Sequence, residues 1–168
     1  TIATNPCGTM TSPISVGPTG TYPTLSGAGG AIAAIQASGI SAPMVIELQS
    51  TYDATGETYP IVLNFNACVT ATNTLTIRPE AGTPSPLLIS SASNVATFDL
   101  NGATNVIIDG RPGGVGSDKY LVIQNTSSTA LSAGNAILLR NDAQSNNIVY
   151  VDVKASNLNP ASNAGTQT

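Results

Sequence analysis

The chain has 168 residues, of which nine are acidic and five basic, with a net charge of −4 at pH 7 and no histidine. This length is enough for one domain with a hydrophobic core, and a second independent core is not expected. The basic residues are scattered singly, so binding of nucleic acid is not expected, and no apolar run is long enough for insertion into a membrane.

The N-terminal region, residues 1–24, is rich in proline and glycine and is expected to form an extended arm or an edge strand. The only convincing helix lies within residues 25–40, at about Gly27–Ser38, with Ser26 as the expected N-cap and Gly39 as the expected C-cap. We expect this helix to cap the N-terminal end of the fold, because the first turn of a solenoid otherwise exposes an unpaired strand edge.

A short sequence motif recurs within residues 41–155. It consists of a polar turn that ends in Asn, followed by a run of β-branched residues. Its copies are Ala71–Ile77, Ala103–Ile108 and, more loosely, Ser145–Val151. Two further sets of short apolar strands accompany the motif in the same order, namely Ile61–Asn64, Phe98–Asn101 and Leu138–Asn141, and before them Met44–Leu48, Leu87–Ile89 and Tyr120–Gln124. This pattern predicts an all-β chain folded as a parallel β-helix of about three coils, with an N-terminal capping helix.

Alternation within the strands separates an inward from an outward face. Leu75 and Ile77 alternate with threonines, and the valines of residues 149–153 alternate with Tyr150 and Asp152. Asparagine is expected at the corners between strands, because it tolerates left-handed backbone angles and its amide can bond neighbouring backbone groups. The expected corner residues are Asn64, Asn73, Asn101, Asn105, Asn141 and Asn147.

The C-terminal region shows no cap. The strand near Ile148–Val153 is followed by a polar segment, residues 156–168, which is either a tail or the start of further coils. We therefore expect either that the chain is a fragment of a longer solenoid, which we favour, or that this end docks on a partner, including a second copy of the chain. The chain starts at Thr1, as a processed secreted chain or a trimmed one would.

Cys7 and Cys68 are the only cysteines. In an exported protein we expect them to form one disulfide, which by the chain-entropy argument would stabilise the fold by roughly 4 kcal/mol. The alternatives are two unpaired thiols or, less favourably, a metal site, since two thiols without histidine fall short of a zinc shell.

Catalytic chemistry has little basis in the sequence, and no catalytic residue is assigned. The lack of histidine excludes Ser-His-Asp and Cys-His sites and leaves paired carboxylates as the remaining option. Asp99 is expected to lie between Val62 and Leu139 of the neighbouring coils, so it has no carboxylate partner. The run Asp109–Gly110–Arg111 predicts a tight turn with a local ion pair, and Asp109 with Arg111 is also the best candidate for a ligand-binding clamp.

No cofactor and no metal site is expected, although calcium remains an alternative. The candidate calcium pairs on loops are Asp53 with Glu57, and Asp109 with Asp118. Asn125–Thr126–Ser127 fits the pattern of an N-glycosylation acceptor, and a chance match is the favoured interpretation.

Residues 20–155 resemble the right-handed parallel β-helix regions of large secreted, adhesin-like surface proteins of Bacteroidota, which are typically exported by the type IX secretion system. The resemblance rests on Thr21–Leu25, Gly30–Ile35, Val45–Leu48, Thr58–Ile61, Thr72–Pro79 and Leu100–Arg111. It implies a secreted, cell-surface location and a non-enzymatic structural or adhesive role toward an unidentified glycan or protein. Tyr22–Thr24 and the helix also look like the start of pectinesterase and pectate-lyase solenoids. The alternative is therefore the N-terminal part of a carbohydrate-active lyase or esterase.

Overall fold

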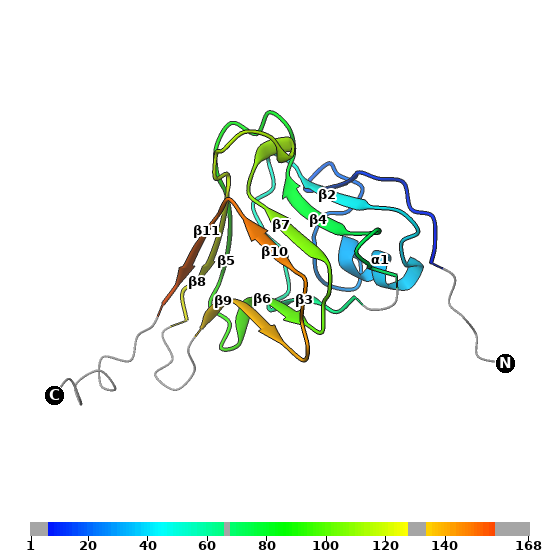
Figure 1. The fold of residues 1–168 in the computed structure, drawn as a ribbon. Coiled ribbons are helices and arrows are strands. Elements are labelled where there is room, and N and C mark those ends of the chain that lie inside the picture. Colours follow the sequence, from blue (N-terminus) through cyan, green and yellow to red (C-terminus); the bar gives the residue numbers. More distant parts are fainter. Residues whose placement is uncertain (1–6, 66–67, 128–133, 157–168) are drawn as a thin grey trace.

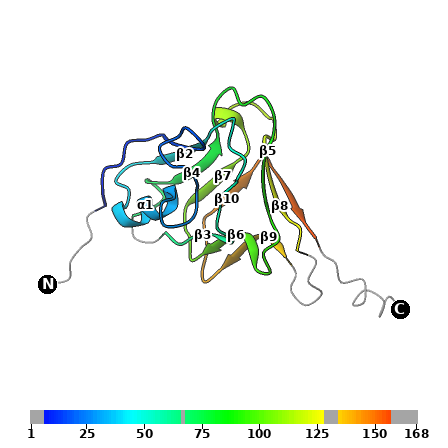
Figure 2. The same ribbon diagram turned by 180° about the vertical axis from the view of Figure 1, so that it is seen from behind.

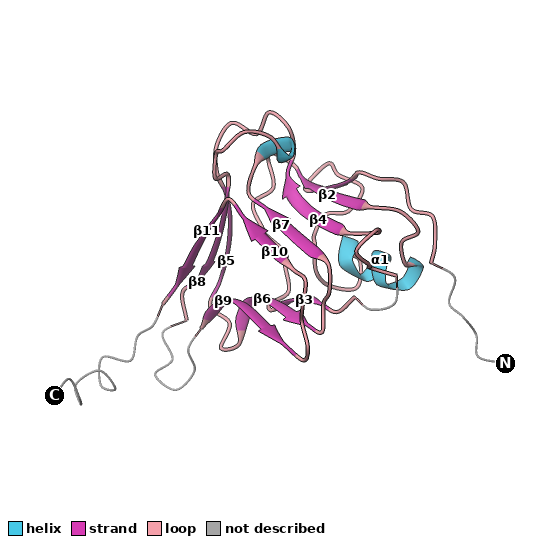
Figure 3. Cartoon of the chain, viewed as in Figure 1, coloured by secondary structure: helices cyan, strands magenta, loops and turns pink. Residues whose placement is uncertain are grey.

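The computed structural model describes residues 7–65, 68–127 and 134–156. These residues form a parallel β-solenoid of about four turns, against about three coils expected from the sequence. Three parallel sheets run along one axis, and the strands of each sheet come from successive turns (Figures 1 and 3). The repeated strand pattern thus predicted the β-helix, and the separate helix signal before it predicted a helix at the N-terminal end.

We name the three sheets A, B and C. Sheet A has the order β1 (Ile14–Val16), β2 (Met44–Leu48), β4 (Leu75–Pro79), β7 (Val106–Asp109) and β10 (Asn147–Val149). Sheet B has the order β3 (Ile61–Leu63), β6 (Ala96–Asn101) and β9 (Asn135–Arg140). Sheet C has the order β5 (Leu87–Ser91), β8 (Leu121–Asn125) and β11 (Val151–Ala155), and a short 3₁₀ turn, η1 (Pro112–Gly114), precedes β8.

The core is built from columns of aliphatic side chains that stack from turn to turn. The longest column, which we call the isoleucine ladder, consists of residues paired in register along sheet A: Ile14, Ile46, Ile77, Ile108 and Ile148. The three central members are fully buried. Each turn therefore places the same apolar shape above and below its neighbours, which satisfies close packing and strand pairing together.

The helix α1 (Ala31–Ser38) lies at the N-terminal end of the solenoid (Figures 1 and 2). It is shorter than expected at its start, because Gly30 is the N-cap and Ser26 does not cap it. Gly39 is the C-cap as expected, with φ of 72° and its N–H donated to the carbonyl of Ile35. The buried side chains of α1 join the same core as the strands; they are Ala31, Ile32 and Ile35.

The region before the helix, expected to form an extended arm or an edge strand, contributes β1, which pairs with β2 as the terminal strand of sheet A. The expected placement of Met44–Leu48 beside Leu87–Ile89 is wrong, because Met44–Leu48 pairs with Leu75–Pro79 in sheet A. The first turn has no strand in sheet C. Instead, the loop after β2 buries the side chain of Tyr52, which interrupts the three-strand pattern that the sequence alone suggests.

Two further register expectations are wrong. Phe98 pairs with Ile137 and Asp99 with Leu138, one residue earlier than expected. The valines expected on one strand are divided between two sheets, because Tyr150 adopts φ of 53° and turns the chain from β10 into β11. A left-handed corner at a tyrosine is uncommon and leaves no clear mark in the sequence.

Candidate functional site

The outer face of sheet A carries a row of charged side chains, which we call the charge ladder: Glu47, Arg78, Asp109 and Arg111. Glu47 and Arg78 pair in register on neighbouring strands. The Oε1 atom of Glu47 accepts hydrogen bonds from Nη2 of Arg78 at 2.8 Å and from Nε at 3.2 Å. The residue that follows Arg78 in the ladder, Asp109, ends β7 on the next turn. Successive turns thus alternate in the sign of their charge.

Asp109 and Arg111 form the local ion pair that their spacing predicts. The guanidinium donates from Nε to Oδ1 at 2.9 Å and from Nη2 to Oδ2 at 2.8 Å, and the main-chain N–H of Arg111 donates to Oδ1 at 3.0 Å. The same guanidinium lies over the ring of Tyr150, 4.5 Å from its centroid. A bidentate carboxylate and an aromatic face therefore hold Arg111 from two sides.

Within the charge ladder, the surroundings of Asp109 and Arg111 favour their ionised forms. Burial alone would raise the pKa of Asp109, but hydrogen bonds from Arg111 and the positive charges of Arg111 and Arg78 outweigh burial, and the pKa lies below its ordinary value. The hydrogen bonds to Asp109 raise the pKa of Arg111. The mutual hydrogen bonds of Asp109 and Arg111 thus favour the charged form of each group.

Sequence reasoning missed Glu47, Arg78 and Tyr150 as members of this arrangement. A signal for the first two exists, because Glu47 and Arg78 are 31 residues apart and the same spacing separates Arg78 from Asp109. The spacing equals that between successive members of the isoleucine ladder from Ile46 to Ile108. One turn of the solenoid therefore takes 31 residues here, and residues at that spacing stack.

Asp99 lies in sheet B, away from the charge ladder. It is flanked in register by Val62 and Leu138, not by Leu139 as expected. Its carboxylate is buried and accepts from Arg140 Nε at 3.0 Å and Nη2 at 2.8 Å. The neighbours on both sides are aliphatic, so the register gives Asp99 no second carboxylate of the kind that glycosidases use.

Glu57 organises the junction between the first turn and the helix. Its Oε1 accepts from the main-chain N–H of Leu25 at 2.6 Å and from the Tyr52 hydroxyl at 2.7 Å. Its Oε2 accepts from Ser26, through both the main-chain N–H at 2.8 Å and the hydroxyl at 2.5 Å. Burial and the Glu57 charge raise the pKa of Tyr52 and raise that of Tyr59 to about 12.

Three of the four loop carboxylates considered for calcium, Asp53, Glu57 and Asp109, have protein partners. Glu57 has the four donors described above, and Asp53 accepts the main-chain N–H of Thr55 at 2.9 Å. Asp109 is bound by Arg111. Within residues 7–65, 68–127 and 134–156, no three His, Cys, Asp or Glu side chains are grouped so that they could hold a metal ion.

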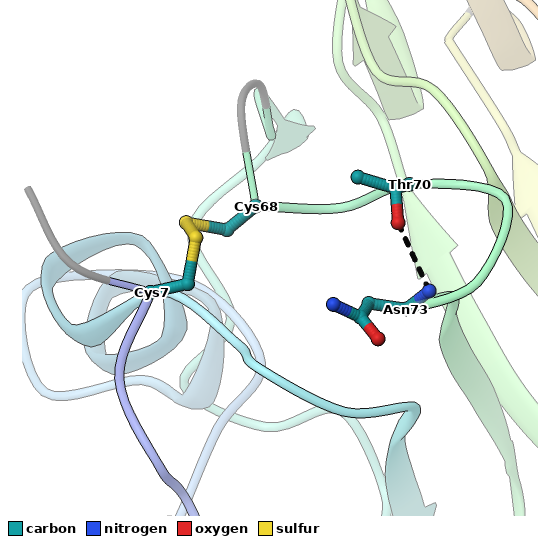
Figure 4. Close-up of a disulfide and its surroundings, with 4 residues drawn as sticks. All are labelled: Cys7, Cys68, Thr70 and Asn73. Carbon is teal, nitrogen blue, oxygen red and sulfur yellow. Dashed lines mark hydrogen bonds between the residues drawn. A yellow bond between two sulfur atoms is a disulfide. The ribbon is translucent and has the colours of Figure 1, made fainter.

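The expected corner asparagines differ in what they do. Asn105 and Asn141 adopt positive φ, of 56° and 53°, and the Asn141 amide donates to Oδ1 of Asn101 at 2.6 Å. Asn73 closes a turn by donating its main-chain N–H to the Thr70 hydroxyl at 3.0 Å (Figure 4). The main-chain carbonyl of Asn64 accepts from the Gln36 side chain at 3.4 Å.

Asn146, rather than Asn147, braces the last corner. Its Oδ1 accepts from Val106 N–H at 3.0 Å and its Nδ2 donates to the Ala103 carbonyl at 2.8 Å, whereas Asn147 belongs to β10. Asn125 has a similar role at the end of β8. It is buried, and its Nδ2 donates to the carbonyls of Ser93 and Asn135, both at 3.0 Å. The side-chain amide of Asn125, the acceptor in the glycosylation pattern, is therefore buried and hydrogen-bonded in this fold.

The expected disulfide between Cys7 and Cys68 is confirmed, with a Cα–Cα distance of 5.6 Å (Figure 4). It ties the arm to the segment after β3, across a sequence separation of 61. Beside it, the main-chain N–H of Gly8 donates to the carbonyl of Ser38, so the arm is also fixed to the end of the helix.

The C-terminal end of the solenoid exposes the ends of its aliphatic columns. Ile148, the last member of the isoleucine ladder, is 36% exposed, Val153 over Ile123 is 48% exposed and Leu139 over Leu100 is 49% exposed. The strands that carry them, β10, β11 and β9, are the edge strands of sheets A, C and B. In the described part of the chain this end, which we call the open end, therefore presents both apolar surface and strand edges.

No protein family, no curated protein and no solved structure matches the chain in the comparisons made with known proteins. The described helices include none that is long and apolar enough to cross a membrane.

Proposed function

We propose that the chain is a non-enzymatic structural and adhesive module of a secreted surface protein, a stiff solenoid segment that presents polar loops. The pairing of its charges supports this proposal most strongly. Four of the five basic side chains are bound to carboxylates, in the pairs Glu47–Arg78, Asp99–Arg140, Asp109–Arg111 and Asp152–Lys154. The pairs Glu47–Arg78 and Asp99–Arg140 join neighbouring turns, whereas the other two are local. Side chains paired with each other are poorly placed to bind or cleave a charged polymer.

The rival function is a polysaccharide lyase or carbohydrate esterase, whose β-helix would gather carboxylates and arginines on one sheet. Among the described side chains, the charge ladder most resembles such an arrangement. The test of enzymatic activity therefore includes a substitution in the charge ladder. We expect no release of unsaturated or reducing ends from polygalacturonate and no de-esterification of pectin above a buffer control. Turnover by the chain that is lost in Asp109→Asn would contradict the proposal.

Secretion is inferred from the disulfide and from the resemblance to exported surface proteins, because protein disulfides persist in oxidising compartments. The measurement is peptide-level mass spectrometry of native material, with free thiols blocked by alkylation before digestion. A linked Cys7–Cys68 peptide in the extracellular or cell-surface fraction is the expected result. Alkylated Cys7 and Cys68 in an intracellular fraction would refute this part of the proposal.

We further propose that the module associates through its open end. The helix α1 lies at the opposite end (Figure 1), so contact between two open ends closes a dimer instead of extending a filament. Sedimentation velocity over a range of concentrations tests this. Association is expected for the wild type, whereas Ile148→Lys should remain monomeric because it places a charge among the exposed column ends.

Val115→Lys is the matched control, since Val115 is 72% exposed on the loop between β7 and β8. This variant is expected to associate like the wild type. A wild type that stays monomeric at every concentration, or a Val115→Lys variant as monomeric as Ile148→Lys, would contradict association through the open end.

A further inference from the structure

In the first full turn, which is formed by β2 and β3, sheet C has no strand, whereas sheets A and B have one each. The first turn supplies β2 to sheet A and β3 to sheet B, but sheet C begins with β5 in the second turn. The loop between β2 and β3 runs along this side of the solenoid without forming a strand, and its Tyr52 side chain is buried in the core. The edge of β5 that faces the first turn consequently has no strand beside it.

The main-chain groups at this edge have no hydrogen-bond partner among the residues that the structure describes. Leu87 donates its N–H to the Tyr120 carbonyl and Ser91 accepts from Thr126 N–H, so the odd-numbered residues of β5 bond to β8. In a parallel pair the intervening residues point their N–H and C=O groups the other way. Leu88 and Ser90 therefore direct theirs to the free edge, and in the described part of the chain no hydrogen bond joins these groups to a partner.

A groove of about 460 Å³ lies along this edge. One wall is the loop at residues 50–55, and the other is formed by Leu88 and Ser90 together with the residues that lead into β5. The groove therefore runs beside the same two residues whose main-chain groups lack partners.

The other two edges at this end of the solenoid are shielded. Beyond β1, Val16 bridges to Tyr22 and Gly17 donates its N–H to the Tyr22 carbonyl. Beside β3, α1 approaches closely enough for Gln36 to bond the Asn64 carbonyl. Proteins commonly cover edges in this way, because bare edges pair with other chains. A hollow of about 410 Å³ also lies between α1 and β3, but there the helix covers the edge. The β5 edge differs in having only the loop at residues 50–55 across the groove from it.

We propose that this groove binds an extended peptide of a partner protein, which pairs in parallel with β5 and supplies the strand that sheet C lacks in the first turn. The inference does not depend on association through the open end. Main-chain bonds to Leu88 and Ser90 give the binding energy, as in other cases of strand addition. Asp53 carries the only charge among the lining residues, so the peptide is neutral or basic. Leu88, which is 47% exposed, favours an apolar neighbour on the outer face.

The test is an amide NMR titration of the ¹⁵N-labelled chain with two end-blocked peptides, TVTVTK and TVTVTE. We expect the lysine peptide to shift the amide signals of Leu88 and Ser90, and the glutamate peptide to bind several-fold more weakly. Asp53→Asn should remove this difference between the peptides without abolishing binding.

Ser90→Pro removes the donor that faces the groove and keeps the bonds to β8, since proline is tolerated on an edge strand whose N–H faces outward. We expect at least about tenfold weaker binding, from the loss of a hydrogen bond and the clash of the ring. Ser90→Thr retains the N–H and is expected to bind like the wild type. The proposal is overturned if neither peptide shifts Leu88 or Ser90, if the shifts fall on β10 and β11 instead, or if Asp53→Asn leaves the preference for lysine unchanged.

Discussion

Replacing an isoleucine of the ladder by Ala should lower the free energy of unfolding more at the centre of the ladder than at its open end. Ile77 is fully buried between Ile46 and Ile108, whereas Ile148 has a ladder neighbour on one side and is 36% exposed. Replacing Ile77 by Ala removes three carbon atoms at about 0.8 kcal/mol each, roughly 2.4 kcal/mol. The cavity left between two fixed neighbours raises the loss of unfolding free energy to about 3–4 kcal/mol.

Replacing Ile148 by Ala loses about two-thirds of that transfer free energy, and no closed cavity forms. The expected loss is about 1.5 kcal/mol. Urea denaturation with the disulfide intact measures both variants. With a slope of about 2 kcal/mol/M, the midpoint should fall by about 1.5–2 M for Ile77→Ala and by about 0.7 M for Ile148→Ala.

The other end of the ladder supplies the control. Ile14 also terminates the column, but it is only 5% exposed because the N-terminal end is covered. Ile14→Ala should therefore cost more than Ile148→Ala. Equal losses at Ile77 and Ile148 in dilute protein would show that the C-terminal end is covered, and a loss below about 1 kcal/mol at Ile77 would refute the stacked core itself.

Three further predictions concern single interactions. Reduction of Cys7–Cys68, which are separated by 61 residues, should lower the free energy of unfolding by about 4 kcal/mol, measured by denaturation with and without reductant. Glu57→Gln should cost about 2 kcal/mol, because one of its oxygens becomes an NH₂ group facing donors; Glu57→Asp, too short to reach them, should not restore the loss. Because the folded-state pKa of Asp109 is lowered, its contribution is present above the ordinary carboxyl pKa and is lost as the pH falls through the folded-state value. Asp109→Asn should accordingly flatten the acid side of the stability profile, and an unchanged profile would contradict the bond to Arg111.

The repeated strand pattern was sufficient to predict the parallel β-helix, because β-branched runs at nearly constant spacing have few other ways to bury one face. It was insufficient for the assignment of each strand to a sheet. The residue pattern of Met44–Leu48 resembles that of the strands that begin at Leu87 and Leu121. Only the buried position of Tyr52 in the fold shows that the first turn has no strand in sheet C. Local pattern carries little information on which neighbour a strand will meet.

The candidate site was predictable in part. The bond between Asp109 and Arg111 is local and follows from their spacing, and the disulfide follows from the cysteine count. The contacts of Arg111 with Tyr150 and of Asp99 with Arg140 join residues about forty apart, so they depend on strand registers. The sequence placed the register of Asp99 one residue out and that of the strand before Tyr150 two residues out. A register error of one residue assigns every side chain of a strand to the wrong face, and left-handed corners such as those at Asn141 and Tyr150 are where the chain passes from one strand to the next.

Hydrogen–deuterium exchange of the chain over a range of protein concentrations tests most directly whether this is an open-ended structural solenoid. In dilute solution we expect the main-chain amides of β10 and β11 to exchange faster than those of β4 and β7, and to gain protection as the concentration rises and open ends meet. Amides of β10 and β11 that are as protected as those of β7 at the lowest concentration, with no dependence on concentration, would contradict the account.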